Sequence, residues 1–448
     1  MIKENLKTGS NMEKRTNYRF VALAMILALL TLSTADRAAI SIAAGGMQKA
    51  LSLDKTSMGI LMSAFSWAYV LGQIPSGWLG DKIGSKKIMA IGVALWSIAT
   101  FIMGFSGWFF FSFGALIVLR ICLGAFETPV GPGSGRILAA WFPTSERGVA
   151  GSIFNSAQYV SIAIFSPFMG WLAYKYGWEY VYIIMGGLGF IFLAFWLKLF
   201  YVPRKHPKVN QAELDYIAAG GGVIDLDSNL GNTDSKTAAK SSFNWSDISK
   251  LFKSRMLVGI FIAQYCVNAI TYFFMTWFPN YLVTARHFNI LTAGIVASLP
   301  AIFGCIGGLS SGFVSDGLLK KSGSLSIARK VPITIGLLLS TSIILCNYTD
   351  SNTVVVAFMC LAFFGKGFGS LGWTVISDTA PKKIVGVASG VFNGLGNLAG
   401  VIVPVIIGII VDKSGSFNGA LVFVGVHGVI AVLSYWLIVG KIQRLEIE

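Results

Sequence analysis

The chain has 448 residues, of which 54% are hydrophobic and only 12% are charged, and its formal net charge is +15. This composition excludes an ordinary water-soluble domain, because one core could not bury so much apolar surface, whereas a lipid bilayer solvates it directly. Nucleic-acid binding is not indicated by the positive charge either, since the Lys and Arg residues follow the pattern of a membrane topology. We therefore expect an all-α membrane protein.

The first apolar run predicts a permanent helix rather than a signal peptide, because it continues without a cleavage site to Asp36 and Arg37. Further runs of about 18 or more apolar residues bring the predicted number of membrane-spanning helices to twelve. They fall into two groups of six: 20–43, 58–80, 88–106, 109–131, 148–173 and 178–201, then 256–283, 291–316, 331–347, 353–376, 385–411 and 418–440.

These helices divide the chain into two six-helix bundles, over residues 20–201 and 256–440. A polar linker, 202–255, joins the bundles and is expected to contain a short helix at Gln211–Ala219. Most of the 35 Lys and Arg residues lie in the tail 1–19, in the linker, in the tail 441–448 and in loops on the same side. The positive-inside rule then places both termini in the cytoplasm.

The two bundles repeat a loop pattern. The second helix ends in Gly77-Trp-Leu-Gly-Asp81-Lys82-Ile-Gly84, and the eighth ends in Gly312-Phe-Val-Ser-Asp316, each followed by basic residues. Such a repeat predicts two bundles around a central cavity that opens alternately to each side. The charges could serve as topology signals alone, or Gly77, Asp81, Lys82 and Asp316 could form gating loops. The first loop resembles the signature of the major facilitator superfamily.

Five ionisable residues fall well inside the predicted helices: Asp36, Arg37, Arg120, Glu127 and Lys366. Each costs roughly 2.5–3.5 kcal/mol at bilayer depth, so such residues are functional candidates. With both carboxylates ionised their charges sum to +1, and protonation of both raises the sum to +3. A site of this kind favours binding of an anion together with protons, which is the thermodynamic basis of symport.

A purely structural role is the alternative for each of these residues. Asp36 could form a structural ion pair with an arginine, Glu127 could pair with Arg120, and Lys366 could extend to an interface or pair with Asp378. Uncharged polar residues could bind a polyhydroxylated substrate or hold helices together. These residues are Tyr69, Asn155, Gln158, Asn268, Trp373, Asn393 and Asn397. No nucleophile–base pair, metal-ligand cluster or Walker loop is visible, so neither an enzyme nor a cofactor is expected.

Longer stretches resemble the bacterial anion:cation symporters, specifically the D-glucarate/D-galactarate transporters. The resemblance rests on Ser63–Pro75, Ser152–Tyr159, Glu213–Gly221, Thr271–Pro279, Leu361–Gly367 and Gly415–Leu421. It implies that Asp36 and Glu127 carry protons. It also implies substrate contacts for Arg37, Tyr69, Arg120, Gln158, Trp373 and Asn393.

Lys366 replaces an uncharged residue of the similar galactonate transporters, and an added cation suits a second carboxylate. Thr34 and the residues after Glu127 depart from the family pattern. The resemblance implies a monomeric importer that moves a sugar-acid dicarboxylate with protons across a bacterial inner membrane. A hexuronate, aldonate or aromatic acid as substrate, anion exchange, and a sensor without transport are the alternatives.

Overall fold

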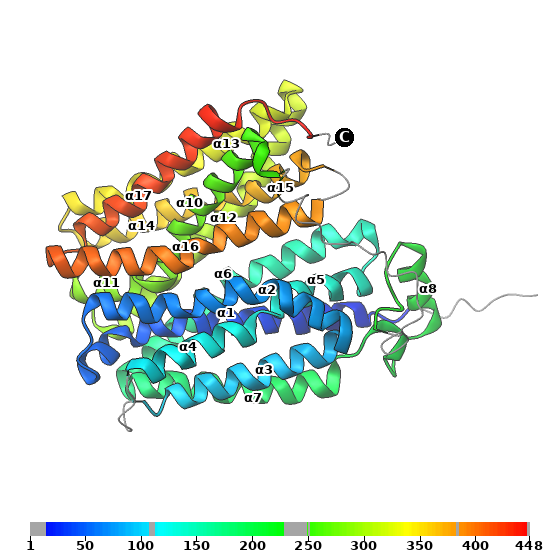
Figure 1. Ribbon diagram of the computed structural model, residues 1–448, viewed down its shortest axis with the longest axis horizontal. Coiled ribbons are helices and arrows are strands. Elements are labelled where there is room, and N and C mark those ends of the chain that lie inside the picture. The colour runs from blue at the N-terminus through cyan, green and yellow to red at the C-terminus, as the bar shows by residue number, and fades with distance from the viewer. Residues whose placement is uncertain (1–14, 107–112, 228–248, 250, 382–384, 446–448) are drawn as a thin grey trace, which may run out of the picture.

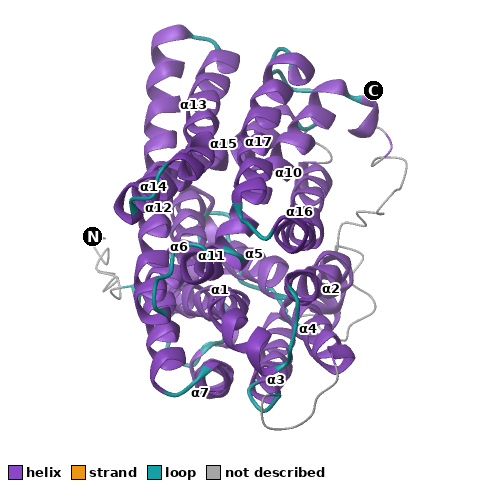
Figure 2. Ribbon diagram, turned by 90° about the vertical axis from the view of Figure 1, so that its left-hand side faces the viewer, coloured by secondary structure: helices purple, strands orange, loops and turns teal. Residues whose placement is uncertain are grey.

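The computed structural model describes residues 15–106, 113–227, 249, 251–381 and 385–445. The first fourteen residues, most of the second part of the linker and the basic pair Lys382–Lys383 lie outside the described residues. Two helical halves lie side by side, the N-terminal half below and the C-terminal half above in Figure 1. Figure 2 shows helices and loops only, and no strand occurs among the residues described.

The N-terminal half consists of seven helical segments that correspond to the first six predicted spans. The predicted fourth span is divided into α4 and α5 at Pro129, since proline cannot donate the backbone hydrogen bond of a continuous helix. The segments are α1 (Tyr18–Ala50), α2 (Lys55–Ile83), α3 (Ser85–Met103), α4 (Phe113–Glu127), α5 (Val130–Trp141), α6 (Thr144–Lys175) and α7 (Trp178–Leu199).

The C-terminal half repeats this arrangement with more interruptions. Its seventh, ninth, tenth and twelfth predicted spans are each divided into two or three segments. The segments are α10 (Arg255–Thr276), α11 (Phe278–Thr284), α12 (Ile290–Ser322), α13 (Leu325–Ser340), η2 (Thr341–Tyr348), α14 (Asn352–Gly367), η3 (Phe368–Ser370), α15 (Leu371–Thr379), α16 (Val385–Ser414), α17 (Asn418–Leu433) and η5 (Ser434–Val439).

Ten helical stretches of the described chain are long and apolar enough to cross a membrane, and bent α2 makes eleven. The bend in α2 measures 55° and falls at Pro75, where the missing N–H breaks the helical hydrogen-bond ladder. The remaining predicted span is α6, whose 32 residues suffice to cross a bilayer. Its apolar run is interrupted by uncharged polar residues, among them Ser152, Asn155, Ser156 and Gln158.

We call the end of the molecule where α1 begins and α2 stops the tail end, and the opposite end the far end. The halves touch closely at the far end, where a Cβ on Gly170 would lie 3.0 Å from Cα of Gly294. Asp412, near the end of α16, accepts hydrogen bonds from the backbone N–H groups of Lys55 and Thr56 and from the Thr56 hydroxyl. Asp412 thereby caps the first turn of α2 across the boundary between the halves, where the helix dipole favours a carboxylate.

The tail end lacks such connections. Among the described residues, no hydrogen bond or ion pair joins the two halves on the tail side of the bond between Asn393 and Gln73. Asp81 and Asp316, the carboxylates of the repeated loop, both pair within their own half. In the described chain, the hydrogen bonds that join the halves therefore lie between the middle of the molecule and the far end.

The start of the linker packs on the tail end of the N-terminal half. It includes η1 (Pro203–Lys205) and α8 (Gln211–Ala219), which occupies the range where the sequence predicts a short helix. Glu213 in α8 is 0% exposed and accepts hydrogen bonds from the backbone N–H groups of Tyr18 and Arg19, both 3.1 Å long. A linker carboxylate therefore caps the first turn of α1.

Candidate functional site

The four ionisable residues of the N-terminal half come together where α1, α2 and α4 pack. Gly124 permits the close approach of α4 to α2, because a Cβ there would overlap the carbonyl oxygen of Phe65. One turn on, Glu127 is 0% exposed, and its Oε2 lies 2.7 Å from Nε of Arg37. The Ser33 hydroxyl donates to the same Oε2 at 2.8 Å and accepts from Nη2 of Arg37 at 3.2 Å.

This geometry differs from the pairing of Glu127 with Arg120 that the sequence left open. Arg120 and Glu127 lie two turns apart on α4, but the Arg120 guanidinium contacts α2, with Nε 3.4 Å from the carbonyl oxygen of Leu61. Glu127 bonds instead to α1. Two helical turns separate Arg120 from Glu127 by a rise of about 10 Å along α4. Arg37 on α1 lies directly opposite Glu127 and is therefore the nearer partner.

Unsatisfied polar atoms remain in the same cluster. Arg120 and Asp36 are each 2% exposed, yet Nη1 of Arg120 and Oδ1 of Asp36 have no hydrogen-bond partner among the described residues. Oε1 of Glu127 is unpartnered as well. Buried polar groups are nearly always paired in folded proteins, so a concentration of unpaired ones marks a site that is completed by a ligand, water or protons.

Aromatic rings surround the Arg37 guanidinium. Its Cζ lies 4.3 Å from the ring centre of Tyr69 and 5.0 Å from that of Phe65, both on α2. Tyr272, on α10 of the other half, also interacts electrostatically with Arg37. Aromatic faces stabilise a guanidinium while leaving its edge free for a carboxylate. The structure thus places Tyr69 beside Arg37 and brings Tyr272, which the sequence analysis did not single out, to the same guanidinium.

The C-terminal half contributes amides and a tryptophan. Asn393 donates from Nδ2 to Oε1 of Gln73 across the halves at 3.3 Å, and Asn397 donates to Oδ1 of Asn393 at 3.0 Å. Trp373 is 45% exposed and stands edge-on to Phe392, with ring centres 5.0 Å apart. Gln158 on α6 is exposed, and no described residue forms a hydrogen bond with it. Trp373 and Gln158 thus present free polar or aromatic surface.

Lys366 stands apart from the carboxylates. Its Nζ lies 5.1 Å from the ring centre of Phe363 and 5.5 Å from that of Tyr159 on α6. No described carboxylate pairs with it, and Asp378, the partner considered from the sequence, binds Arg329 at 3.0 Å. Lys366 is therefore half-buried between the halves, and in the part of the chain that the structure describes its ammonium group contacts aromatic faces and no carboxylate.

The predicted gating residues form equivalent clusters in both halves. Asp81 pairs with Arg136, whose Nη2 lies 2.9 Å from Oδ1 of Asp227 in the linker. Asp316 lies 3.8 Å from Arg329, which also binds Asp378. These arginines tie the gating loops to their own half. The Nζ of Lys82 lies 4.0 Å from the centre of the Trp78 ring. A Cβ added to Gly77 would lie 3.9 Å from the Pro132 side chain, so the structure leaves room for a side chain there.

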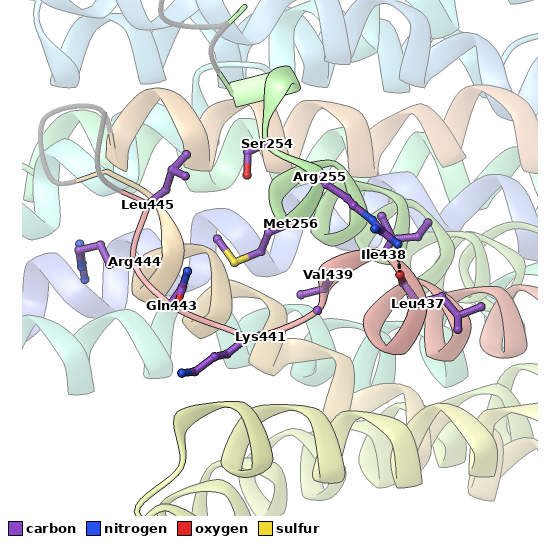
Figure 3. A pocket seen from close by; sticks show the side chains of 11 residues that line it. Ser254, Arg255, Met256, Leu437, Ile438, Val439, Lys441, Gln443, Arg444 and Leu445 are labelled. Atoms are coloured by element: carbon purple, nitrogen blue, oxygen red, sulfur yellow. Dashed lines mark hydrogen bonds between the residues drawn. The ribbon is translucent and has the colours of Figure 1, made fainter. Parts of the chain in front are cut away.

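A pocket of about 640 Å³ lies outside this region, between the start of α10 and the end of the chain. Figure 3 shows Arg255 and Met256 on one side and the segment from Lys441 to Leu445 on the other. None of the predicted site residues lines it. Among the described residues, no group of His, Cys, Asp and Glu side chains could hold a metal ion.

Sequence reasoning missed three residues of the central region: Ser33, Gln73 and Tyr272. Ser33 precedes Arg37 by four positions, so helical periodicity would have placed both on one face of α1. Gln73 follows Tyr69 by the same interval on α2. For Tyr272, no spacing rule applies, because its position near Arg37 depends on how the two halves meet.

Comparison with known proteins agrees with this architecture. The Major Facilitator Superfamily profile matches residues 26–326 and 322–445. The chain is 50% identical over 445 residues to a probable galactarate/D-glucarate transporter of Escherichia coli K12, covering 99% of this chain and 98% of that one. A probable galactarate/D-glucarate transporter of Bacillus subtilis is 51% identical over 451 residues, covering 100% and 97%. An Escherichia coli D-galactonate transporter is 37% identical, covering 97% and 99%.

Solved structures of the same fold are more distant in sequence. A bacterial homologue of the human lysosomal transporter Spinster, crystallised inward-facing and unoccupied, superposes with a TM-score of 0.74 at 17% identity, covering 95% of this chain and 98% of that one. A D-xylose–proton symporter superposes with a TM-score of 0.71 at 15% identity, covering 95% of this chain and 99% of that one. From its full-length match and its two helical halves, the chain belongs to the Major Facilitator Superfamily and is a multi-pass membrane transporter, not an enzyme.

Proposed function

We propose that this protein imports a six-carbon sugar dicarboxylate, D-glucarate or D-galactarate, together with protons. The observation that carries the proposal is the full-length identity of about half with probable transporters of these two acids. Import proceeds by alternating access, with the substrate bound between the two halves. The protein works as a monomer in a bacterial inner membrane with both termini in the cytoplasm, as the distribution of Lys and Arg favours.

The charges of the central region support coupling to protons. Arg37 is held by Glu127 at 2.7 Å, so a substrate carboxylate must compete with Glu127 for the guanidinium. Protonation of Glu127 removes this competition, and protonation of Asp36 removes a second negative charge. Proton and anion then favour each other's binding, and by linkage the effect is reciprocal. Asp36 and Glu127 are the proposed proton carriers.

The substrate contacts divide between the halves. One carboxylate binds Arg37 and the free Nη1 of Arg120, because arginine recognises two carboxylate oxygens at once. The second carboxylate binds Lys366, which lacks a described acidic partner. Tyr69, Gln158 and Asn393 bind hydroxyl groups, and Trp373 covers the carbon chain. Gly77, Asp81, Lys82 and Asp316 form the gate at the tail end, where Asp81 and Asp316 each pair with an arginine of their own half.

An aldonate is the second candidate substrate, because the D-galactonate transporter is 37% identical over nearly the full chain. A monocarboxylate of that kind would leave Lys366 without a partner. A hexuronate would do the same, so the number of carboxylates distinguishes the candidates.

The test is uptake of labelled glucarate into proteoliposomes with an inward proton gradient, with and without a protonophore. Galactarate, galactonate and galacturonate serve as competitors. We expect accumulation that collapses with the protonophore and is inhibited mainly by galactarate. Uptake inhibited best by galactonate would move the substrate to an aldonate, uptake unaffected by the protonophore would contradict proton coupling, and specific binding without flux would indicate a sensor.

A further inference from the structure

Of the hydrogen bonds that join the two halves of the described chain, one lies nearer the tail end than the others. Nδ2 of Asn393, on α16, donates to Oε1 of Gln73, on α2, at 3.3 Å, and both residues are half-buried. Farther from the tail end, the Tyr272 hydroxyl on α10 forms a hydrogen bond with Ser66 on α2. Lys55 and Thr56 form the other hydrogen bonds between the halves of the described chain, at the far end. A ligand that enters between the halves from the tail end therefore meets these two amides before the other hydrogen bonds that join the described halves.

The orientation of these amides follows from a chain of donors. The Tyr272 hydroxyl donates to Oδ1 of Asn397 at 3.1 Å, which turns Nδ2 of Asn397 toward Asn393. Asn393 accepts that N–H on its Oδ1 at 3.0 Å and so presents its own Nδ2 to Gln73. Each amide has one donor side and one acceptor side, so the phenol determines the direction of the whole chain.

Gln73 has the right position and one free donor. It follows Tyr69 by one helical turn on α2, and the Tyr69 ring packs against Arg37. Nε2 of Gln73 makes no hydrogen bond to a described residue. Gln73 also ends the first straight segment of α2, because the 55° bend begins immediately after it. A group bound to Gln73 therefore lies between the proposed carboxylate site and the segment that leads to the gating loop.

We propose that Gln73 is a specificity-determining residue that binds, together with Asn393, a hydroxyl group of the sugar acid in place of their direct bond. A hydroxyl fits because it donates to Oε1 of Gln73 and accepts from Nδ2 of Asn393 at the same time. A methylene group can do neither and would leave both amides unpaired, which sites built for hydroxyls penalise strongly. The inference rests on the proposed function, since it concerns how a hydroxylated dicarboxylate is recognised.

The test compares two six-carbon dicarboxylates as inhibitors of labelled glucarate uptake: galactarate, with four hydroxyls, and adipate, which has none. In Gln73→Leu we expect the inhibition constant of galactarate to rise about tenfold, while that of adipate changes less than about twofold. Asn393→Leu should lower the discrimination by a similar factor. The double variant should show little further change, because both substitutions remove one shared hydroxyl site.

Gln264→Leu is the matched control, since Gln264 bonds to Asn268 on its own helix rather than across the halves. Gln73→Met keeps an unbranched chain and replaces Gln73→Leu if the latter is not monodisperse in detergent. An equal loss of affinity for both inhibitors would show a structural role for Gln73 and overturn the inference. A wild-type protein that takes up no glucarate overturns the proposed function and this inference with it, whereas normal uptake with unchanged discrimination in Gln73→Leu overturns the inference alone.

Discussion

The two halves share a fold but differ in the charged residues at their centres. At the tail end they are alike, because an arginine holds the loop aspartate in each: Arg136 binds Asp81, and Arg329 binds Asp316. Their centres are not alike. The centre of the N-terminal half holds the buried Asp36, Glu127 and Arg120 and the partly buried Arg37. The centre of the C-terminal half offers Lys366 and a row of amides.

This difference separates two tasks that one substrate requires. Binding of protons and of a carboxylate needs charged groups that influence one another through a poorly screened interior, and these lie together on α1 and α4. Recognition of hydroxyls needs neutral donors and acceptors of fixed direction, which α16 supplies. The contrast can be tested by substituting the titratable Glu127, the cation Lys366 and the far-end residue Asp412 in turn.

The largest effect is expected for Glu127→Gln. Glutamine keeps an oxygen for Arg37 and Ser33 but cannot bind or release a proton at physiological pH. Uptake driven by a pH gradient should fall to the level of leakage, while exchange of labelled for unlabelled substrate persists. Proteoliposome uptake and counterflow measure the two. Glu179→Gln, in the first turn of α7, is the control, and proton-driven accumulation at wild-type rates in Glu127→Gln would refute the assignment.

An intermediate effect is expected for Lys366→Gln. If Lys366 binds the second carboxylate, the half-saturation concentration for glucarate should rise about tenfold, because a hydrogen bond to a charged group is lost. Inhibition by galactonate, which has one carboxylate, should change little. Competition assays on Lys366→Gln and on the exposed Lys321→Gln measure this difference. The same loss for both acids would point to a role in folding or gating instead.

The smallest effect is expected for Asp412→Asn. The amide retains an acceptor for the start of α2 but loses the charge that the helix N-terminus favours, at a cost of about 1 kcal/mol. Spin labels at Lys49→Cys and Lys413→Cys, on opposite halves at the far end, should show a larger population of long distances. Asp350→Asn alters a far-end carboxylate within one half and should leave the distribution unchanged. An unchanged distribution in Asp412→Asn would mean that packing and the bond between Lys55 and Asn280 close this end without the Asp412 charge.

Much of the fold follows from the sequence, because long apolar runs, proline positions and the repeated loop each depend on local chemistry. The sequence likewise predicted the short helix at Gln211–Ala219 within the polar linker, and α8 has these bounds. The partner of Glu127 was not, since periodicity places Arg120 on the same face of α4 but cannot say which residue of α1 lies opposite. The bond between Gln73 and Asn393 depends on how two bundles meet, and no spacing within either helix encodes it.

The docked start of the linker changes where one half stops and the other begins. Glu213 caps α1, and Asp227 accepts both the backbone N–H of Ser85 and a guanidinium N–H of Arg136. These bonds tie residues 203–227 to the N-terminal half. We therefore expect them to move with that half, so that its mechanical boundary is Asp227 rather than the last residue of α7. A chain divided for co-expression as two fragments keeps its first fragment whole only if the cut falls beyond that aspartate.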